Sequence, residues 1–111
     1  MFCKAEASYM AKFVKVASID ELEAGQCKTV RANGRIIALY NVDGTFYATE
    51  DTCSHNGGPL GEGTLEGTTI TCPWHYWQYD VVTGKMMVNA STRIETYVVR
   101  VEGNDVLVDV E

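Results

Sequence analysis

The sequence predicts an all-β fold, and three observations support that prediction. Short runs rich in β-branched and aromatic residues recur along the chain, glycines separate many of them, and the period of an amphipathic helix is almost absent. The predicted strands are 13–17, 27–31, 36–42, 46–49, 68–71, 85–88, 96–101 and 106–110.

Turn residues between these runs predict how the strands connect. Asp43-Gly44 separates the third and fourth runs and Gly103-Asn104 separates the last two, so both pairs predict two-residue hairpin turns. Glu66-Gly67 marks a third candidate hairpin. Ser18, with a glutamate three residues later, is placed to cap one short helical turn.

Length and composition indicate a single soluble domain. The chain has 111 residues, 46% of them hydrophobic, and a formal net charge of −6. It has no apolar run of the roughly 18 residues that a membrane helix needs, and its start lacks the pattern of a secretory signal. We therefore expect a cytoplasmic protein with no membrane association. Residues 1–11 show no periodicity and are expected to form a disordered extension before a domain spanning 12–111.

The charge is concentrated in the middle of the chain. The segment 36–84 contains no lysine or arginine and six acids, which are Asp43, Glu50, Asp51, Glu62, Glu66 and Asp80. An acidic chain is a poor ligand for nucleic acid, which we exclude as a partner. The segment is either an ordinary solvated surface or a docking face that steers basic partners.

Two short motifs hold both histidines and two of the four cysteines. They are Cys53-Ser-His55 and Cys72-Pro-Trp-His75, with sixteen residues between them. Each motif offers one thiolate and one imidazole, a ligand set that suits either tetrahedral zinc or an iron–sulfur centre.

The spacing favours iron and sulfur over zinc. A single residue separates Cys53 from His55, so both side chains would converge on one ion only with difficulty. If each loop instead sends its cysteine to one iron and its histidine to another, a two-iron cluster spans the two loops. Cys27 lies within a predicted strand and is expected to be a buried thiol rather than a ligand.

The two motifs, followed by Tyr79-Asp80, resemble the signature of the Rieske family. The resemblance covers roughly residues 12–111 and implies an antiparallel β-sandwich whose tip holds one Rieske-type [2Fe-2S] cluster between two loops. It implies that Cys53 and Cys72 bind one iron and that His55 and His75 bind the other. In size and layout the chain is similar to the Rieske ferredoxins that serve aromatic-ring-hydroxylating dioxygenases.

Departures from the family pattern bear on the reduction potential. High-potential members have an extra disulfide and a serine near the cluster. By the resemblance, the corresponding residues here are Gly58, Trp74 and Trp77, so neither the disulfide nor the serine hydroxyl is expected. Fewer donors to the cluster sulfurs predict a potential near the low end of the roughly −150 to +300 mV Rieske range. Tyr79 either donates a hydrogen bond to a cysteine sulfur or only packs. Tyr76 replaces a usual glycine, so it is strained if that position has positive φ, unless it simply packs.

The resemblance implies an electron carrier and not an enzyme. Its partners would be a flavoprotein reductase and a terminal oxygenase, met transiently by a monomer. Both histidines are already used by the cluster, so a second, mononuclear iron site is not expected. The expected docking face has an apolar rim and a set of steering acids. The rim is Trp74, Trp77 and Pro59, and the acids are Glu50, Asp51, Glu62 and Asp80.

Three alternatives stay open at this stage, and one of them is that the cluster serves another oxygenase system or a sensing role. The same fold could serve as the small Rieske-like subunit of a nitrite reductase, which a co-purifying large subunit would reveal. A zinc-stabilised binding module would use the same four ligands, but it would be colourless and redox-silent.

Overall fold

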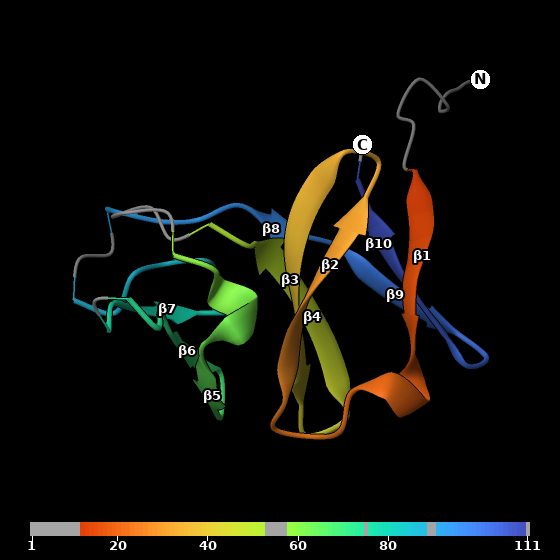
Figure 1. The fold of residues 1–111 in the computed structure, drawn as a ribbon, viewed down its shortest axis with the longest axis horizontal. Helices are drawn as coiled ribbons and strands as arrows, with labels where there is room; N and C mark the ends of the chain where they lie inside the picture. The colour runs from red at the N-terminus through yellow and green to blue at the C-terminus, as the bar shows by residue number, and fades with distance from the viewer. Residues whose placement is uncertain (1–11, 53–57, 75, 89–90, 111) are drawn as a thin grey trace, which may run out of the picture.

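The computed structural model describes residues 12–52, 58–74, 76–88 and 91–110, and in these the all-β prediction is confirmed. They form ten strands and two single 3₁₀ turns (Figure 1). The strands are β1 (Phe13–Ser18), β2 (Cys27–Ala32), β3 (Arg35–Val42), β4 (Thr45–Glu50), β5 (Thr64–Glu66), β6 (Thr69–Thr71), β7 (Gln78–Asp80), β8 (Thr96–Tyr97), β9 (Val99–Glu102) and β10 (Asp105–Asp109). The 3₁₀ turns are η1 (Ile19–Glu21) and η2 (Leu60–Glu62).

Three antiparallel sheets make up the fold. One has the order β1-β10-β9, a second the order β2-β3-β4-β8, and a small third sheet the order β5-β6-β7. The first two sheets form the predicted sandwich, while the small sheet stands to one side of it, with η2 between them (Figure 1). Cys72, the described ligand candidate of the second motif, lies between β6 and β7 of this small sheet.

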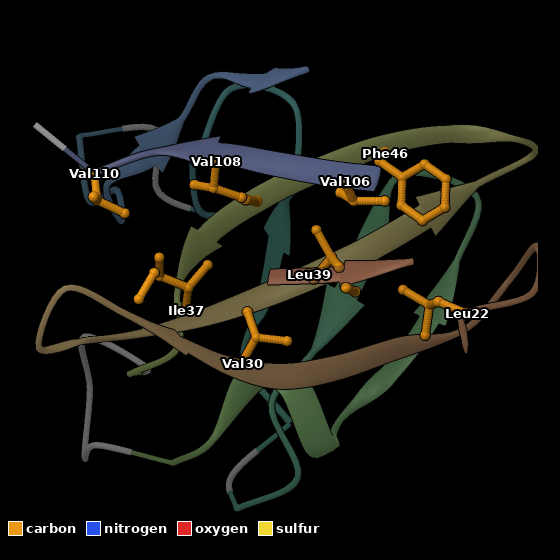
Figure 2. Close-up of a cluster of buried hydrophobic side chains, with 11 residues drawn as sticks. Leu22, Val30, Ile37, Leu39, Phe46, Val106, Val108 and Val110 are labelled. Atoms are coloured by element: carbon orange, nitrogen blue, oxygen red, sulfur yellow. The ribbon is translucent and has the colours of Figure 1, made fainter. Parts of the chain in front are cut away.

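The sandwich encloses the first of two apolar cores. Alternate side chains of the two sheets meet between them, as a strand period of two requires (Figure 2). Its buried members are Ala17, Leu22, Val30, Ala32, Ile37, Leu39, Phe46, Ala48, Val106, Val108 and Val110.

A second core lies on the other face of the central sheet. Strand β3 supplies both cores, because Ile37 and Leu39 point into the sandwich while Ala38 and Tyr40 point toward the small sheet. All four side chains are fully buried, which explains why β3 is a continuous apolar run rather than an alternating one. The second core joins the central sheet to Leu60, Leu65, Ile70, Cys72, Tyr79, Val81, Met86 and Ile94.

Hairpin turns form where two-residue turn signals stand. Asp43 and Gly44 have φ of 53° and 95°, the left-handed pair of a type I′ turn, and join β3 to β4 as predicted. Asn33-Gly34, with φ of 52° and 80°, makes the same kind of turn between β2 and β3. Our sequence analysis did not single out this second pair, although Asn-Gly is a strong hairpin signal.

The other two predicted hairpins are also present. Gly103-Asn104 joins β9 to β10, with Glu102 paired to Asp105. The β5–β6 hairpin turns at Gly67 and Thr68, one residue later than the predicted Glu66-Gly67, because Glu66 is the last paired residue of β5.

Some strand predictions are wrong in detail. Segment 85–88 makes only isolated bridges, from Lys85 to Arg93 and from Met86 to Tyr79, and is not a strand. The predicted strand 96–101 divides at Val98, because its first part pairs with β4 and its second part with β10. Strands β5 and β7, of three residues each, were not predicted.

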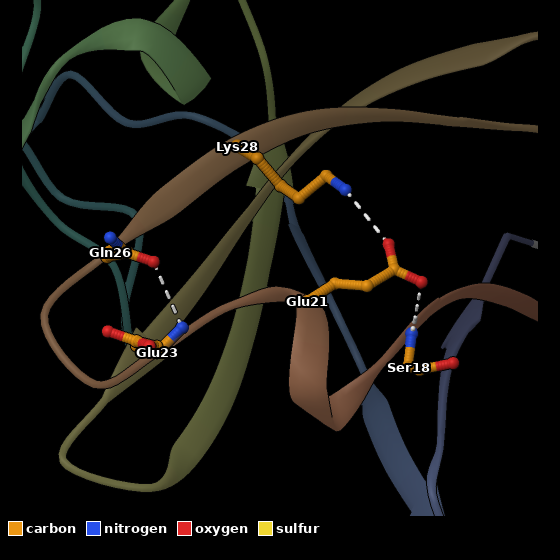
Figure 3. Close-up of polar contacts among 5 residues, drawn as sticks. All are labelled: Ser18, Glu21, Glu23, Gln26 and Lys28. Atoms are coloured by element: carbon orange, nitrogen blue, oxygen red, sulfur yellow. Dashed lines mark hydrogen bonds and ion pairs between the residues drawn. The ribbon is translucent and has the colours of Figure 1, made fainter.

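The predicted helical turn after Ser18 is the 3₁₀ turn η1, whose start is fixed by Glu21 (Figure 3). The Ser18 backbone N–H donates to Glu21 Oε2 at 3.1 Å, and Lys28 Nζ donates to Glu21 Oε1 at 3.1 Å. In the following loop, the Glu23 N–H donates to Gln26 Oε1 at 3.1 Å. These bonds link β1 to β2.

Two further predictions concern the chain as a whole. The expected extension over residues 1–11 lies outside the described residues. Among the residues that are described, no helix is long enough and apolar enough to cross a membrane.

Candidate metal centre

The first motif lies in a loop whose two ends are held together. Thr52 and Pro59 form an isolated antiparallel bridge. Just outside that bridge, the Leu60 N–H donates to the Asp51 carbonyl oxygen at 2.6 Å. The chain therefore leaves β4 and returns to η2 at one narrow neck. Cys53 and His55 fall within 53–57, outside the described residues, so their role as ligands stays a prediction.

The second motif forms a tight loop between β6 and β7. The Cys72 N–H donates to the Trp77 carbonyl at 2.8 Å, and the Tyr76 N–H donates to the Cys72 carbonyl at 3.0 Å. Tyr76 closes this loop with φ of 62°, so the positive φ considered in the sequence analysis is present. His75 lies outside the described residues.

The two loops meet at Gly58 and Cys72, as the sequence predicted for loops that share one centre. A β-carbon added at Gly58 would lie 2.6 Å from Cys72 Sγ and 3.1 Å from Trp74 Cγ. The Cys72 side chain is fully buried, so its sulfur is shielded from water on the face that Gly58 covers. A buried sulfur facing a residue without a side chain fits a thiolate ligand of an iron–sulfur group.

The aromatic residues predicted to surround the centre divide into two groups. Tyr79 is fully buried in the same core as Cys72, and Trp77 packs against that core while half-buried. Trp74 is 55% exposed and Tyr76 is 76% exposed, so Tyr76 is not held by aromatic packing. Whether the Tyr79 hydroxyl donates to a cysteine sulfur stays a prediction.

Four acids were predicted to steer a partner, and for Asp51 the prediction is wrong. Its side chain is only 5% exposed, and its Oδ1 accepts hydrogen bonds from Gly61 N and Thr29 Oγ1 at 2.7 and 3.0 Å. Asp51 therefore belongs to the interior, where it has no access to a partner. The burial was not visible in the sequence because its partners lie on β2 and η2.

The other three acids differ in how free their carboxylates are. Glu50 is half-buried and its Oε2 accepts the Glu95 N–H at 2.7 Å. Asp80 is also half-buried and accepts the N–H of Val82 at 2.8 Å. Glu62 is exposed on η2.

The surface beside the second loop is apolar rather than acidic. Met87 and Val88 are 52% and 84% exposed. With Tyr76, Trp77, Gln78 and Met86 they line a shallow hollow of about 130 Å³. Sequence reasoning missed this surface because the apolar run 86–88 was interpreted as a strand.

Cys27 is a thiol of another kind. It begins β2, is half-buried, and its Sγ donates to the Gly63 carbonyl at 3.5 Å. Burial, with a smaller contribution from the Asp51 charge, raises the pKa of the Cys27 thiol, so it stays protonated near neutral pH. This supports the prediction that Cys27 is not a ligand, since a ligand must be a thiolate.

Comparison with known proteins agrees with these features. The Rieske [2Fe-2S] domain model matches residues 12–102 of the chain. The ferredoxin component of the naphthalene 1,2-dioxygenase/salicylate 5-hydroxylase systems of Ralstonia sp is 38% identical over 100 residues, covering 89% of this chain and 96% of that protein.

Solved structures give the same result. In the complex of reduced oxygenase and oxidized ferredoxin of carbazole 1,9a-dioxygenase, a chain that is 35% identical superposes with a TM-score of 0.82, covering 89% of this chain and 94% of that one. A nitrite reductase small subunit, at 21% identity, a TM-score of 0.76 and coverage of 87% and 97%, shares the fold alone. The chain therefore belongs to the Rieske [2Fe-2S] family, and it is an electron-transfer ferredoxin with one Rieske-type cluster.

Proposed function

We propose that this chain carries single electrons from a flavoprotein reductase to a terminal aromatic-ring-hydroxylating oxygenase. It would do so in the cytoplasm, as a monomer formed by one domain over 12–111. The observation that carries the proposal is the contact of Gly58 with Cys72, which joins the two motif loops in a chain whose relatives are dioxygenase ferredoxins. The oxygenase partner is supported by the carbazole 1,9a-dioxygenase complex, in which a similar ferredoxin chain is bound to its oxygenase.

The proposed ligands are the four motif residues. Cys53 and Cys72 would bind one iron, and His55 and His75 the other, which is the Rieske ligand set. The bound cluster supplies one-electron redox chemistry. The described residues supply the setting, because Cys72 is shielded from water and Gly58 leaves space against its sulfur.

The first experiment measures the cluster itself. Purified protein should show the visible absorption of a Rieske centre and, after reduction, its electron paramagnetic resonance signal. A colourless protein that binds zinc would support the alternative of a binding module. His55→Cys and His75→Cys should each lower the midpoint potential in film voltammetry, because a thiolate adds negative charge to the cluster. An unchanged potential in both variants would reject these two ligands.

For docking, we propose the exposed apolar surface beside the second loop, formed by Trp74, Tyr76, Met87 and Val88. Exposed apolar side chains that gather on one surface favour association with a partner. Of the four acids predicted to steer a partner, Glu62 is the one that is exposed and would steer the approach. Because that steering is electrostatic, added salt should slow reduction by the reductase.

A matched pair of valines tests the docking surface. Val88 is 84% exposed beside the second loop, and Val98 is 62% exposed where the chain passes from β8 to β9. Val88→Ser should raise the ferredoxin concentration needed for half-maximal oxygenase turnover several-fold, while Val98→Ser should leave it unchanged. Equal effects of the two variants would reject the surface.

Partner identity is tested separately. Reduced protein should be reoxidised by an aromatic-ring-hydroxylating oxygenase component with its substrate and oxygen. Co-purification with a large nitrite reductase subunit, without electron transfer to the oxygenase, would favour the nitrite reductase alternative instead.

A further inference from the structure

Asp51 is a buried charged side chain placed two residues before the first motif. It is 5% exposed, and it is the one charged residue among the buried residues that the structure describes. Burying a carboxylate is costly unless hydrogen bonds compensate for the lost water. A buried carboxylate does not improve solubility, so Asp51 must have another role. Its burial also excludes the docking role expected from the sequence.

The hydrogen bonds of Asp51 join three elements to the neck of the first loop. Its N–H donates to the Ile36 carbonyl of β3 at 3.2 Å, and its carbonyl accepts the Leu60 N–H at 2.6 Å. Its Oδ1 accepts from Thr29 Oγ1 on β2 at 3.0 Å and from the Gly61 N–H on η2 at 2.7 Å. Asp51 thus fixes both the residue where the loop begins and the turn where it ends.

Gly61 brings the turn η2 directly against β2. A β-carbon at this position would lie 2.6 Å from the Thr29 backbone nitrogen and 2.7 Å from the Lys28 carbonyl carbon. No side chain fits there unless η2 moves away from β2. The close approach is what allows one carboxylate oxygen to accept from Thr29 and Gly61 together.

We propose that Asp51, Thr29 and Gly61 form a latch that positions the first cluster-binding loop. The latch holds the loop's returning end so that Gly58 lies on Cys72, and in this way it sets the place of Cys53 and His55 relative to the second loop. Asp51 is a positioning residue in this proposal, because it acts through the loop and not on the cluster. The proposal rests on the function and ligands proposed above.

Thr29→Val is the decisive variant, because valine has the same branched shape as threonine, lacks the hydroxyl and changes no charge. It removes the hydroxyl that donates to Asp51 Oδ1. Of the two hydrogen bonds to this oxygen, only the one from the Gly61 N–H then remains. The holoprotein should lose its cluster to an iron chelator about tenfold faster than the wild type. The amides of Leu60 and Gly61 should also exchange with deuterium about tenfold faster, while amides of β9 and β10 keep their rates.

Asp51→Asn and Asp43→Asn form a matched pair that removes the same charge from two sites. Asp43 is exposed in the β3–β4 turn at φ 53°, a conformation that asparagine accepts. Asp51→Asn weakens a charge-assisted pair of bonds and should release the cluster faster than Asp43→Asn. Its electron paramagnetic resonance signal should be broadened, because the loop then samples several positions, whereas Asp43→Asn should give the wild-type signal.

Three outcomes separate the possibilities. Wild-type release rates, amide exchange and spectra in Thr29→Val would overturn the latch, even if Asp51→Asn does not fold. Faster exchange at Leu60 and Gly61 with faster cluster release establishes it. A wild-type protein without any Rieske signal would instead reject the proposed function, and the latch with it.

Discussion

Gly58 and Cys72 lie in direct contact across the two motif loops, so close that a β-carbon on residue 58 would stand 2.6 Å from the Cys72 sulfur. The glycine has an ordinary backbone conformation, since its φ is not among the positive values in the chain. The site therefore requires the small volume of glycine at this position and not its conformational freedom. A side chain at position 58 would therefore clash with the sulfur and would also crowd the Trp74 ring.

Gly58→Ala tests this requirement. The added methyl group should cost about 1–3 kcal/mol of unfolding free energy, as overpacking of a tight interior does. We also expect less cluster per chain, measured as the ratio of visible to ultraviolet absorbance. Gly67→Ala is the control, since a β-carbon there meets nothing within 4 Å. It should leave that ratio unchanged despite the strain of its φ of 60°. Equal cluster content in the two variants would contradict the assignment.

A pair of leucines distinguishes the two cores. Leu39 lies in the sandwich core and Leu60 in the core beside Cys72, and both are fully buried. Leu39→Ala and Leu60→Ala should each lower the free energy of unfolding by about 2–5 kcal/mol. Only Leu60→Ala should change the midpoint potential, because Leu60 begins the turn that ends the first loop. A shift of similar size in Leu39→Ala would mean that the central sheet does not insulate the site.

The parts of the fold that the sequence predicted are those governed by local patterns. Asp43-Gly44 marked its hairpin because both residues accept positive φ. The apolar run 36–42 marked a strand, and its lack of alternation agrees with burial on both faces. The family and the meeting of the two loops were predicted from the motifs, because the spacing of ligand residues is itself a local pattern.

What sequence reasoning missed depends on contacts between distant residues. Asp51 belongs to an acidic stretch and was assigned to the surface, yet Thr29, 22 residues earlier, and Gly61, ten residues later, bury it. Met87 and Val88 are apolar and were assigned to a strand, but they are exposed beside the second loop. Polarity along the chain predicted the opposite environment in both cases, and both places adjoin the site.

The ion pair between Glu21 and Lys28 makes stability depend on acid pH. The hydrogen bond from Lys28, then the Ser18 N–H and the Lys28 charge, hold the pKa of the exposed Glu21 carboxyl below its ordinary value of 4.5. A carboxyl whose pKa is lowered by folding stabilises the folded state at pH values above its pKa in the unfolded chain. This stabilisation is lost as the pH falls through the pKa of the folded state. The contribution should therefore be constant near neutral pH and disappear below about pH 4.5.

Lys28→Met should show this window directly. Chemical unfolding at a series of pH values should find the variant less stable than the wild type near neutral pH, with the difference shrinking as Glu21 is protonated. Glu23→Gln is the control, because the contact of Glu23 in Figure 3 uses its backbone N–H and not its carboxylate. A Lys28→Met deficit that stays constant into acid would show that lost packing of the lysine stem, and not the ion pair, is responsible.

Tyr76 combines a strained backbone with an exposed ring, and two substitutions separate these properties. Its φ of 62° lies in the left-handed region, which costs an L-residue about 1–2 kcal/mol, while the ring is 76% exposed. Glycine removes that strain but gives the unfolded chain extra freedom worth about 0.5–1 kcal/mol. Tyr76→Gly should therefore be more stable than Tyr76→Ala by about 0.5–1 kcal/mol in chemical unfolding.

Both Tyr76 variants lose the ring from the proposed docking surface, so both should weaken transfer to the oxygenase by the same factor. The difference between them in stability and their equality in transfer are independent measurements. If Tyr76→Gly transfers electrons as well as the wild type while Tyr76→Ala does not, the loop conformation and not the aromatic ring sets docking. If the two variants are equally stable, the backbone of the second loop relaxes when the tyrosine is removed, and the positive φ is not a source of strain.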